Sequence, residues 1–188
     1  MNYIPEKLEK TFEELEITQK DFWNVSRATG NFLNMLIKIR NVKSALEIGT
    51  SNGYSGLWLL DGLKQTKGHL TTIEYYDKRQ SIARTNFDKC GFIGMYTPLL
   101  GSACDVLESF SSDKMFDFVF IDANKREYIK NFELIKPHLL PNAIICADNV
   151  NSHREKVQTY LDAIIADDDF QTEIIDLPAG LAISYKLN

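Results

Sequence analysis

The 188-residue sequence is poor in cysteine, and the few cysteines it has are widely spaced. Cys90, Cys104 and Cys146 are odd in number and form no Cys-x-x-Cys pair. That pattern argues against a disulfide framework and against a zinc site built on paired cysteines. We therefore expect three reduced thiols that serve as packing residues.

Excess positive charge and long apolar runs are also lacking. Lysine and arginine number 21 against 26 aspartates and glutamates, which gives a net charge of -5 and a pI near 5.3. A broad phosphate-binding surface needs a basic face, so nucleic acid is a poor partner. No apolar run approaches the roughly 18 residues of a membrane span, and residues 1–10 lack the apolar core of a secretory signal. We expect a cytoplasmic protein with neither nucleic acid nor a membrane as partner.

The sequence has no repeat, low-complexity tract or Pro/Gly-rich linker that would mark a domain boundary. Its length suits one substantial core. Its 44% hydrophobic and 25% charged residues are typical of a globular protein. We predict a single domain over residues 1–188, with N-terminal helices in residues 1–42 and a sheet core in residues 43–188.

From about Lys43 onward, short apolar or β-branched runs alternate with longer segments of helical period, which is typical of βα units around a parallel sheet. Strands are predicted at Ser44–Ile48, Leu70–Glu74, Met95–Leu99, Phe116–Ile121, Ala143–Ala147, Thr172–Asp176 and Leu181–Leu187. Helices are predicted at Glu6–Leu15, Gly30–Ile39, Tyr54–Gln65, Lys78–Cys90, Cys104–Phe110, Arg126–Leu140 and Arg154–Ala166. Only Leu177–Gly180 separates the last two strands, so they should form an antiparallel hairpin. The prediction is an α/β fold with a seven-stranded, mostly parallel sheet, an antiparallel last strand and helices on both faces.

The stretch "ALEIGTSNGYSG" at residues 45–56 predicts a strand, a turn with Gly49 and Gly53, and a helix. Glycines let the backbone approach a ligand, and the helix N-terminus offers free N–H groups. Glu74 ends the next strand, where an acid can bind both hydroxyls of a ribose. The Gly-x-x-x-Gly spacing disfavours a dinucleotide, and Glu47 suits a sulfonium cation better than a pyrophosphate. The turn taken alone is equally compatible with an ordinary βα turn, but the ordered set of acids and glycines favours a cationic nucleoside.

Three oxygen-bearing side chains follow two neighbouring predicted strands. Asp122 ends "FDFVFID", and Asp148 with Asn149 ends "AIICADN". Ligands bind outside the carboxyl ends of such strands, and two carboxylates with an amide suit a hard divalent cation such as Mg²⁺. Lys125 should project over the same point, where a metal would lower its pKa toward that of a general base. Taken singly, each has an ordinary alternative: a turn cap for Asp148, a loop position for Asn149 and a surface ion pair for Lys125.

Other polar and aromatic residues are predicted to lie outside the site. His153 should be exposed in the first turn of a helix capped by Ser152. Four aromatics at helical spacing are expected in the core or an interface rather than as a substrate platform; these are Trp23, Phe32, Trp58 and Phe132. Tyr54, the first residue after the glycine turn, remains open.

Five segments carry a family resemblance: "GNFLNMLIKIRNVKSALEIGTSNGYSGLWL", "TTIE", "FDFVFIDANKREY", "CADNV" and "GLAISYK". Together they resemble the metal-dependent class I S-adenosylmethionine O-methyltransferases related to catechol and caffeoyl-CoA O-methyltransferases, from about Val25 to Lys186. The resemblance implies a Rossmann-like methyltransferase fold. It implies a cofactor site for S-adenosylmethionine made of Val25, Glu47, Gly49, Thr50, Gly53, Tyr54, Ser55, Glu74, Ala103 and Asp122. It further implies a metal site at Asp122, Asp148 and Asn149, with Mg²⁺ expected and Ca²⁺ or Mn²⁺ as alternatives, and Lys125 as the catalytic residue.

The expected function is methyl transfer to a hydroxyl of a small, catechol-like acceptor with metal assistance. A metal-independent methyltransferase acting on another small molecule and a non-catalytic cofactor-binding module stay open, and a nicotinamide dehydrogenase ranks last. Relatives are commonly dimers, so a homodimer is expected. Two departures concern the acceptor: Asn151 to His153 lead directly into a helix where relatives have a Trp- and Gly-rich segment, and Asn124 replaces an aspartate.

Overall fold

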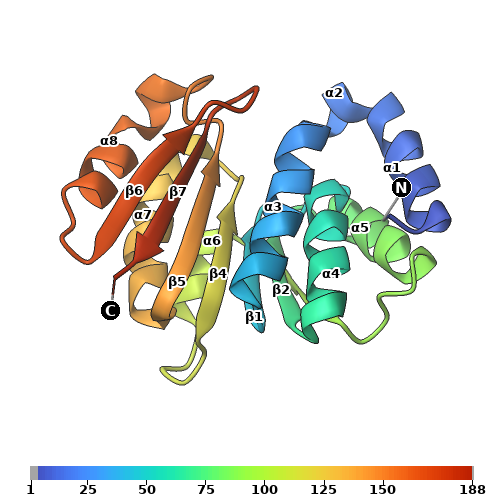
Figure 1. Ribbon diagram of the computed structural model, residues 1–188, viewed down its shortest axis with the longest axis horizontal. Coiled ribbons are helices and arrows are strands. Elements are labelled where there is room, and N and C mark those ends of the chain that lie inside the picture. The colour runs from blue at the N-terminus through green and yellow to red at the C-terminus, as the bar shows by residue number, and fades with distance from the viewer. Residues whose placement is uncertain (1–3, 188) are drawn as a thin grey trace.

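The computed structural model describes residues 4–187, so the outermost residues of the predicted domain, 1–3 and 188, lie outside the description. The chain folds into alternating helices and strands (Figure 1). The elements are α1 (Glu6–Ile17), α2 (Gln19–Phe22), α3 (Arg27–Arg40), β1 (Ser44–Ile48), α4 (Tyr54–Thr66), β2 (His69–Glu74), α5 (Asp77–Lys89), β3 (Tyr96–Leu100), α6 (Ala103–Glu108), β4 (Phe116–Ile121), η1 (Lys125–Glu127), α7 (Tyr128–Ile135), η2 (Lys136–His138), β5 (Leu139–Asp148), α8 (Arg154–Ile165), β6 (Phe170–Ile175) and β7 (Leu181–Lys186).

Seven strands form one sheet in the order β3-β2-β1-β4-β5-β7-β6. The first five strands pair in parallel, and β7 runs antiparallel to both of its neighbours. The predicted α/β fold with one reversed strand is therefore confirmed. The strand order changes direction between β1 and β4, and in sheets of this kind the carboxyl ends beside that point form the ligand crevice.

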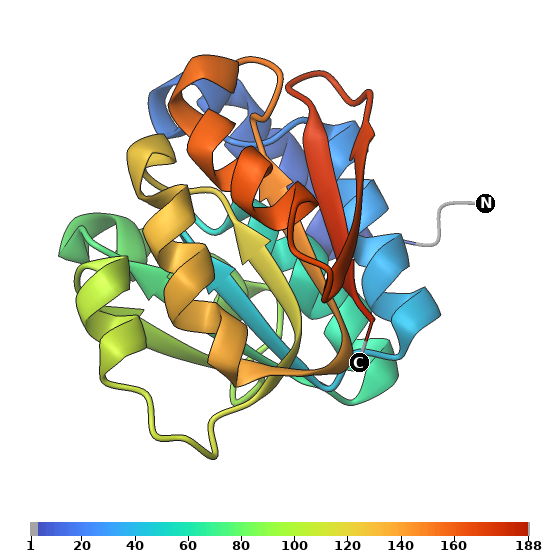
Figure 2. The same ribbon diagram turned by 90° about the vertical axis from the view of Figure 1, so that its left-hand side faces the viewer.

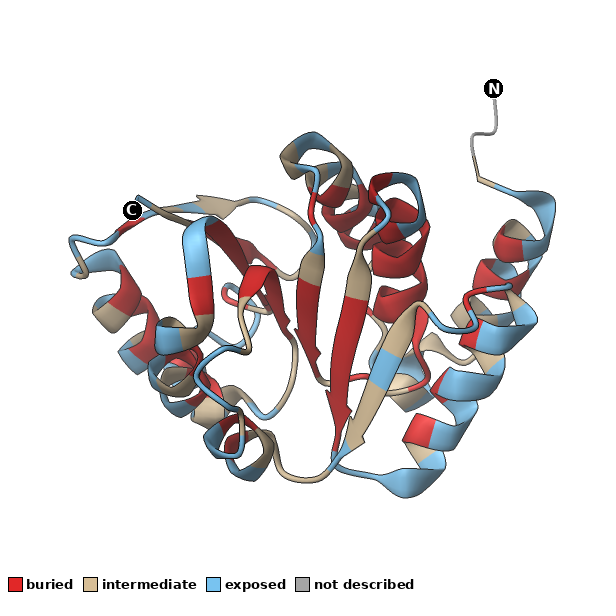
Figure 3. Ribbon diagram, turned by 90° about the horizontal axis from the view of Figure 1, so that it is seen from below, coloured by how far each residue is buried: buried red, intermediate tan, exposed pale blue. Residues whose placement is uncertain are grey.

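Helices cover both faces of the sheet, because the central strands carry apolar residues on both sides. Phe118 and Phe120 of β4 pack with residues of α3, α4 and α5, whereas Val119 and Ile121 pack with residues of α6, α7 and α8. Figure 2 shows α7 and α8, in orange, on the near face of the sheet and α3, in blue, on the far side. In Figure 3 the central strands are buried between the two helical layers. Such a strand reads as a continuous apolar run, as "FDFVFI" does.

The predicted helix Arg126–Leu140 is wrong at its C-terminal end. α7 ends at Ile135, a 3₁₀ turn containing Pro137 follows, and β5 begins at Leu139. Proline lacks the N–H that would continue the helix, and Leu139 instead pairs with Phe116 of β4. The short helix α2 was not predicted from the sequence.

Two smaller expectations have different outcomes. Cys104 and Cys146 are free and buried, and Cys90 is free and partly buried, which confirms their role in packing. Ser152 is not the cap of α8, because the helix begins at Arg154 with His153 at the N-cap and no side-chain cap bond. Within residues 4–187, no helix combines the length and the apolarity needed to cross a membrane.

Candidate functional site

A pocket of about 940 Å³ lies along the carboxyl ends of β1 to β5. Ten residues of the predicted site line it: Val25, Gly49, Thr50, Tyr54, Ser55, Glu74, Ala103, Asp122, Lys125 and Asn149. The other three predicted residues, Glu47, Gly53 and Asp148, lie behind the lining within the described chain. The fold thus gathers the strand-end residues around one pocket.

Gly49 lies where the end of β1 meets the end of β4. Its φ is +104°, and a Cβ there would lie 2.2 Å from the backbone oxygen of Asp122. Gly53, with a φ of +87°, begins α4 against the ring of Phe87, which a Cβ would approach to 2.7 Å. Glycine is therefore required at both positions for backbone conformation and close packing.

Glu47 is fully enclosed beneath the turn. Its carboxylate accepts hydrogen bonds from the Ser55 hydroxyl and from the Thr72 hydroxyl, each at 2.6 Å. Burial raises the pKa of Glu47 to about 7, although both hydrogen bonds favour the charged form. With Thr72 donating to Glu47, Thr50 is the donor to Thr72, at 2.5 Å. Glu47 therefore orients groups that line the pocket rather than lining it.

The Glu74 carboxylate is fixed across the turn at the end of β2. It accepts from the backbone N–H of Ser51 at 2.7 Å and from that of Tyr76 at 2.9 Å. Each carboxylate oxygen keeps a further lone pair for a ligand hydroxyl. The acid is thus held in place at the pocket lining.

Asp122 and Asp148 follow paired residues of β4 and β5, since Ile121 pairs with Ala147. The Lys125 Nζ donates to Asp122 Oδ1 at 2.5 Å. Asp148 is 2% exposed, and its Oδ1 has no hydrogen-bond partner among the described residues. Burial first, and then the charge of Asp122, raise the pKa of Asp148 to about 7. The charge of Asp122 therefore acts on Asp148, which also has a buried oxygen without a partner among the described residues.

The residues at this end fit a hard divalent cation. The unpartnered oxygen of Asp148 and the mutual repulsion with Asp122 are what a cation would relieve. No group of three or more His, Cys, Asp or Glu side chains in the described part of the chain is placed so that it could hold a metal ion, so Asn149 would have to be the third ligand. Asn149 has a φ of +64°, a left-handed conformation that asparagine adopts more readily than most residues. A set of two carboxylates and an amide leaves positions for water or acceptor oxygens.

Two residues that were expected outside the site line the pocket. Trp23 is 74% exposed and lines the pocket beside α2, so it is not a core residue, and its predicted place in an interface stays a prediction. It falls at the left-handed end of a four-residue helix, where helical spacing no longer predicts burial. His153 also lines the pocket. Trp58 and Phe132 are buried as expected, and Phe32 is partly buried against the core.

Sequence reasoning also missed the cover that α2 provides over the turn. The Ser51 hydroxyl donates to the backbone oxygen of Phe22 at 2.9 Å. The Arg79 guanidinium lies 4.9 Å from the ring centroid of Trp23, a cation–π distance. A four-residue helix carries too little periodicity to be found in a sequence.

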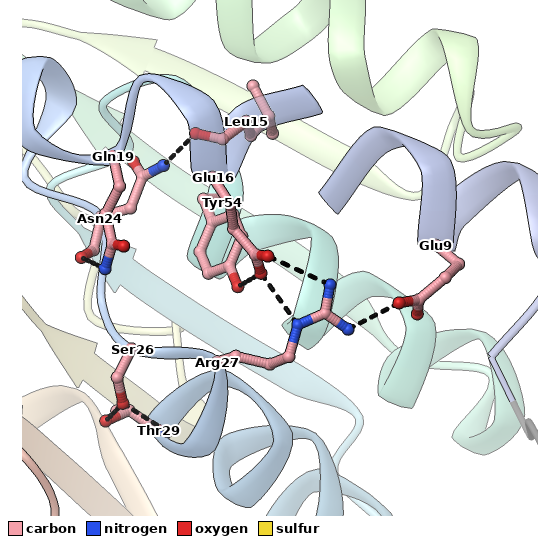
Figure 4. Close-up of polar contacts among 9 residues, drawn as sticks. All are labelled: Glu9, Leu15, Glu16, Gln19, Asn24, Ser26, Arg27, Thr29 and Tyr54. Carbon is pink, nitrogen blue, oxygen red and sulfur yellow. Dashed lines mark hydrogen bonds and ion pairs between the residues drawn. The ribbon is translucent and has the colours of Figure 1, made fainter. Parts of the chain in front are cut away.

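Tyr54 lines the pocket, but its hydroxyl faces α1 (Figure 4). That hydroxyl donates to Glu16 at 2.5 Å, and Arg27 joins Glu16 at 2.9 Å to Glu9 at 2.7 Å. Burial, followed by the bond to Glu16, raises the pKa of Tyr54. The network ties α1 to the first turn of α4, so the Tyr54 hydroxyl is already engaged within the protein.

The family model for O-methyltransferases matches residues 3–173. The chain belongs to the O-methyltransferase family. It is 35% identical over 129 residues to a catechol O-methyltransferase of Niastella koreensis, an alignment covering 68% of this chain and 58% of that protein. It is 30% identical over 201 residues to caffeoyl-CoA O-methyltransferase 2 of Zea mays, in an alignment that covers 94% of this chain and 75% of that protein. The chain thus spans a little over half the length of the catechol O-methyltransferase that it matches.

A solved relative agrees with the fold of this O-methyltransferase family member. The O-methyltransferase from Bacillus cereus, in complex with S-adenosylhomocysteine, superposes with a TM-score of 0.86 at 27% identity. The superposition covers 98% of this chain and 93% of that one. The Rossmann-like methyltransferase fold and the family predicted from the sequence motifs are both confirmed.

Proposed function

We propose that this protein is an S-adenosylmethionine-dependent O-methyltransferase that methylates a hydroxyl of a small catechol-like diol with the help of a divalent metal. One observation carries the proposal: a single pocket joins the glycine turn and Glu74 to Asp122, Lys125 and Asn149. The family membership and the product-bound relative from Bacillus cereus support the cofactor. The names of the relatives support the acceptor class.

The β1 and β2 ends would hold the cofactor. The fixed Glu74 carboxylate can accept hydrogen bonds from the ribose hydroxyls. The glycine turn lets the backbone approach the methionine part, and the first turn of α4 offers N–H groups at its N-terminus. The sulfonium of the cofactor supplies the methyl group, and its positive charge is accommodated by the acids on this edge of the sheet.

The β4 and β5 ends would hold the acceptor and the metal. Asp122, Asp148 and Asn149 would bind the cation, with Mg²⁺ favoured by the oxygen ligands. When bound, such a cation supplies Lewis acidity that lowers the pKa of an acceptor hydroxyl. Lys125 in its neutral form would take the proton of that hydroxyl on Nζ, and Asp122 keeps Nζ at the pocket. The pocket walls would place the acceptor oxygen near the methyl group, and such placement can supply much of the rate.

A metal-independent reaction is the second candidate. The ion pair between Lys125 and Asp122 favours it, because the lysine alone already neutralises one of the two acids. In that case Asp122 would be a pocket residue rather than a metal ligand. The acceptor would then not need two adjacent hydroxyls.

The test is an assay with radiolabelled S-adenosylmethionine and a panel of catechols matched to monophenols of the same size. We expect label in the catechols only, and only with added Mg²⁺. Transfer that persists in EDTA would replace the proposal with the metal-independent reaction. Tight cofactor binding without transfer to any acceptor would indicate a non-catalytic binding module.

A further inference from the structure

The hydroxyl of Tyr128 lies beneath the acids at the ends of β4 and β5. Tyr128 is the first residue of α7 and is fully buried. Its hydroxyl lies 3.1 Å from the carbonyl oxygen of Ile121 and 3.2 Å from that of Asp148, so it touches both strand ends. The Nζ of Lys125 lies 2.9 Å away on the pocket side. One hydroxyl therefore joins the two strand ends to the lysine.

The direction of the phenol O–H is fixed by its surroundings. Carbonyl oxygens only accept hydrogen bonds, so the phenol hydrogen must point to one of the two strand-end carbonyls. The lone pairs of the oxygen remain for Lys125. Tyr128 thus presents a fixed acceptor to the lysine.

Lys125 is held between two acceptors, Asp122 Oδ1 at 2.5 Å and the Tyr128 hydroxyl at 2.9 Å. A single acceptor would leave a four-carbon side chain several rotamers, whereas two acceptors define the position of Nζ. The remaining tetrahedral position of the nitrogen then points away from both acceptors. Lys125 lines the pocket, so that position is the one left for an acceptor bound there.

We propose that Tyr128 is a positioning residue that holds the Nζ of Lys125 against the hydroxyl to be methylated, a role that rests on the proposed methyl transfer. Its ring is fixed independently of its hydroxyl, because it packs edge-on to Tyr160 with centroids 5.8 Å apart. Tyr128→Phe should therefore remove the acceptor and keep the packing. Tyr160→Phe is the matched control, since Tyr160 is equally buried and, among the described residues, its hydroxyl makes no hydrogen bond to Lys125 or to the ends of β4 and β5.

The first measurement compares kcat, KM and the cofactor Kd of the two tyrosine variants. Tyr128→Phe should lower kcat roughly 10- to 100-fold, the loss that follows from a small misplacement of a reacting group. Cofactor Kd and acceptor KM should stay within about twofold of wild type, and Tyr160→Phe should keep its kcat. Unchanged kcat in Tyr128→Phe would overturn the role. So would equal losses of kcat and cofactor affinity in both variants.

A double-mutant cycle tests whether Tyr128 acts through the lysine. In a Lys125→Ala background, Tyr128→Phe should cause no further loss of kcat, because the group that it positions is gone. If the two losses multiply instead, Tyr128 acts by another route and the proposal fails.

Crystal structures of Tyr128→Phe and Tyr160→Phe give a readout that needs no methyl transfer. Nζ of Lys125 should leave its place only in Tyr128→Phe. If the wild-type protein methylates nothing while Nζ moves in this way, the proposed function fails and the positioning of Lys125 by Tyr128 stands. If Nζ stays in place in both variants, the positioning role fails whatever the activity.

Discussion

The two ends of the pocket differ in how their acids are partnered. At the β1–β2 end, Glu47 and Glu74 each accept two hydrogen bonds from neighbouring groups. At the β4–β5 end, Asp148 keeps a buried oxygen without a partner in the described chain, and Asp122 is joined by a lysine. Buried charged groups are costly without partners. The acids at the β1–β2 end are thus completed by the fold, whereas Asp148 leaves the set of acids at the β4–β5 end incomplete, and the proposed cation would supply its missing partner.

The largest expected effect falls at the incomplete end. Lys125→Ala should lower kcat roughly 10²- to 10⁴-fold, the usual contribution of a general base. Cofactor affinity should remain nearly unchanged, because the proposed cofactor contacts lie mainly at the other end. Steady-state kinetics and cofactor titration by calorimetry measure both quantities.

Lys130→Ala is the matched control for this prediction. Lys130 is about half exposed and pairs with Glu108 at 3.1 Å, and such surface pairs contribute little. The kcat of Lys130→Ala should equal that of wild type. Wild-type turnover in Lys125→Ala would remove the lysine from the mechanism.

The junction between the two ends can be broken at Gly49. In Gly49→Ala the new Cβ would meet the backbone oxygen of Asp122 at 2.2 Å in a left-handed conformation. We expect a loss of about 2–4 kcal/mol in the free energy of unfolding, together with loss of cofactor binding. Urea unfolding monitored by circular dichroism measures the free energy of unfolding.

Gly91→Ala is the control that separates backbone strain from a steric clash of the new Cβ. Gly91 also has a left-handed φ, of +82°, but no atom beyond its chain neighbours lies within 4 Å of the place that a Cβ would take. The loss in the free energy of unfolding for Gly91→Ala should stay near the roughly 1–2 kcal/mol that a left-handed conformation costs by itself. Equal losses in both variants would contradict a close contact between the β1 and β4 ends.

Asp148→Asn tests the incomplete end without a metal. Because the pKa of Asp148 is raised to about 7, the ionised acid destabilises the folded state above that pH. At pH 8 and in EDTA, Asp148→Asn should be more stable than wild type by roughly 1–3 kcal/mol, and the gain should vanish near pH 4. Added Mg²⁺ should raise the thermal midpoint of the wild type and not of the variant.

Asp117→Asn should have the opposite effect on folding stability. Asp117 is also buried on β4, but at the other end of the strand its oxygens accept from the backbone N–H groups of Lys43 and Ser44, at 2.8 Å and 2.9 Å. An amide nitrogen there would face an N–H donor, so stability should fall. Destabilisation by both substitutions would mean that Asp148 is as well partnered as Asp117.

The fold could be predicted from the sequence because its signals are local. The run at Phe116–Ile121 and the hairpin loop at Leu177–Gly180 each identify their element without information from the rest of the chain. The misplaced end of the helix predicted from Arg126 depended on tertiary pairing. Leu139 is apolar and follows a helical segment, and only its pairing with Phe116 makes it the start of β5.

The sequence indicated which residues would gather at this edge of the sheet, but not how deeply each of them is buried. Sequence order placed Glu47 and Asp148 at strand ends, yet it could not reveal that both lie behind the lining. Tyr128 gave no signal, because a tyrosine opening a helix is ordinarily core, and its role depends on three groups brought together only by the fold. Trp23 and His153 reach the pocket through loop geometry that has no period.

The smallest effect is expected at the completed end and depends on pH. The pKa of Glu47 is raised from its ordinary 4.5 to about 7, so the folded state binds a proton more tightly than the unfolded chain does. Stability should therefore fall as pH rises from about 5 to about 7, with a slope of at most about 1.4 kcal/mol per pH unit from this group. Glu47→Gln should remove that slope, because the amide does not titrate; it keeps one acceptor oxygen for Ser55 or Thr72 and presents an N–H donor to the other hydroxyl, which must turn to accept. Urea midpoints for the metal-free proteins at several pH values measure it, in an Asp148→Asn background so that Asp148 contributes nothing. Parallel curves for the two proteins would mean that Glu47 stays ionised throughout, and that the hydroxyl donors beneath the turn fully offset its burial.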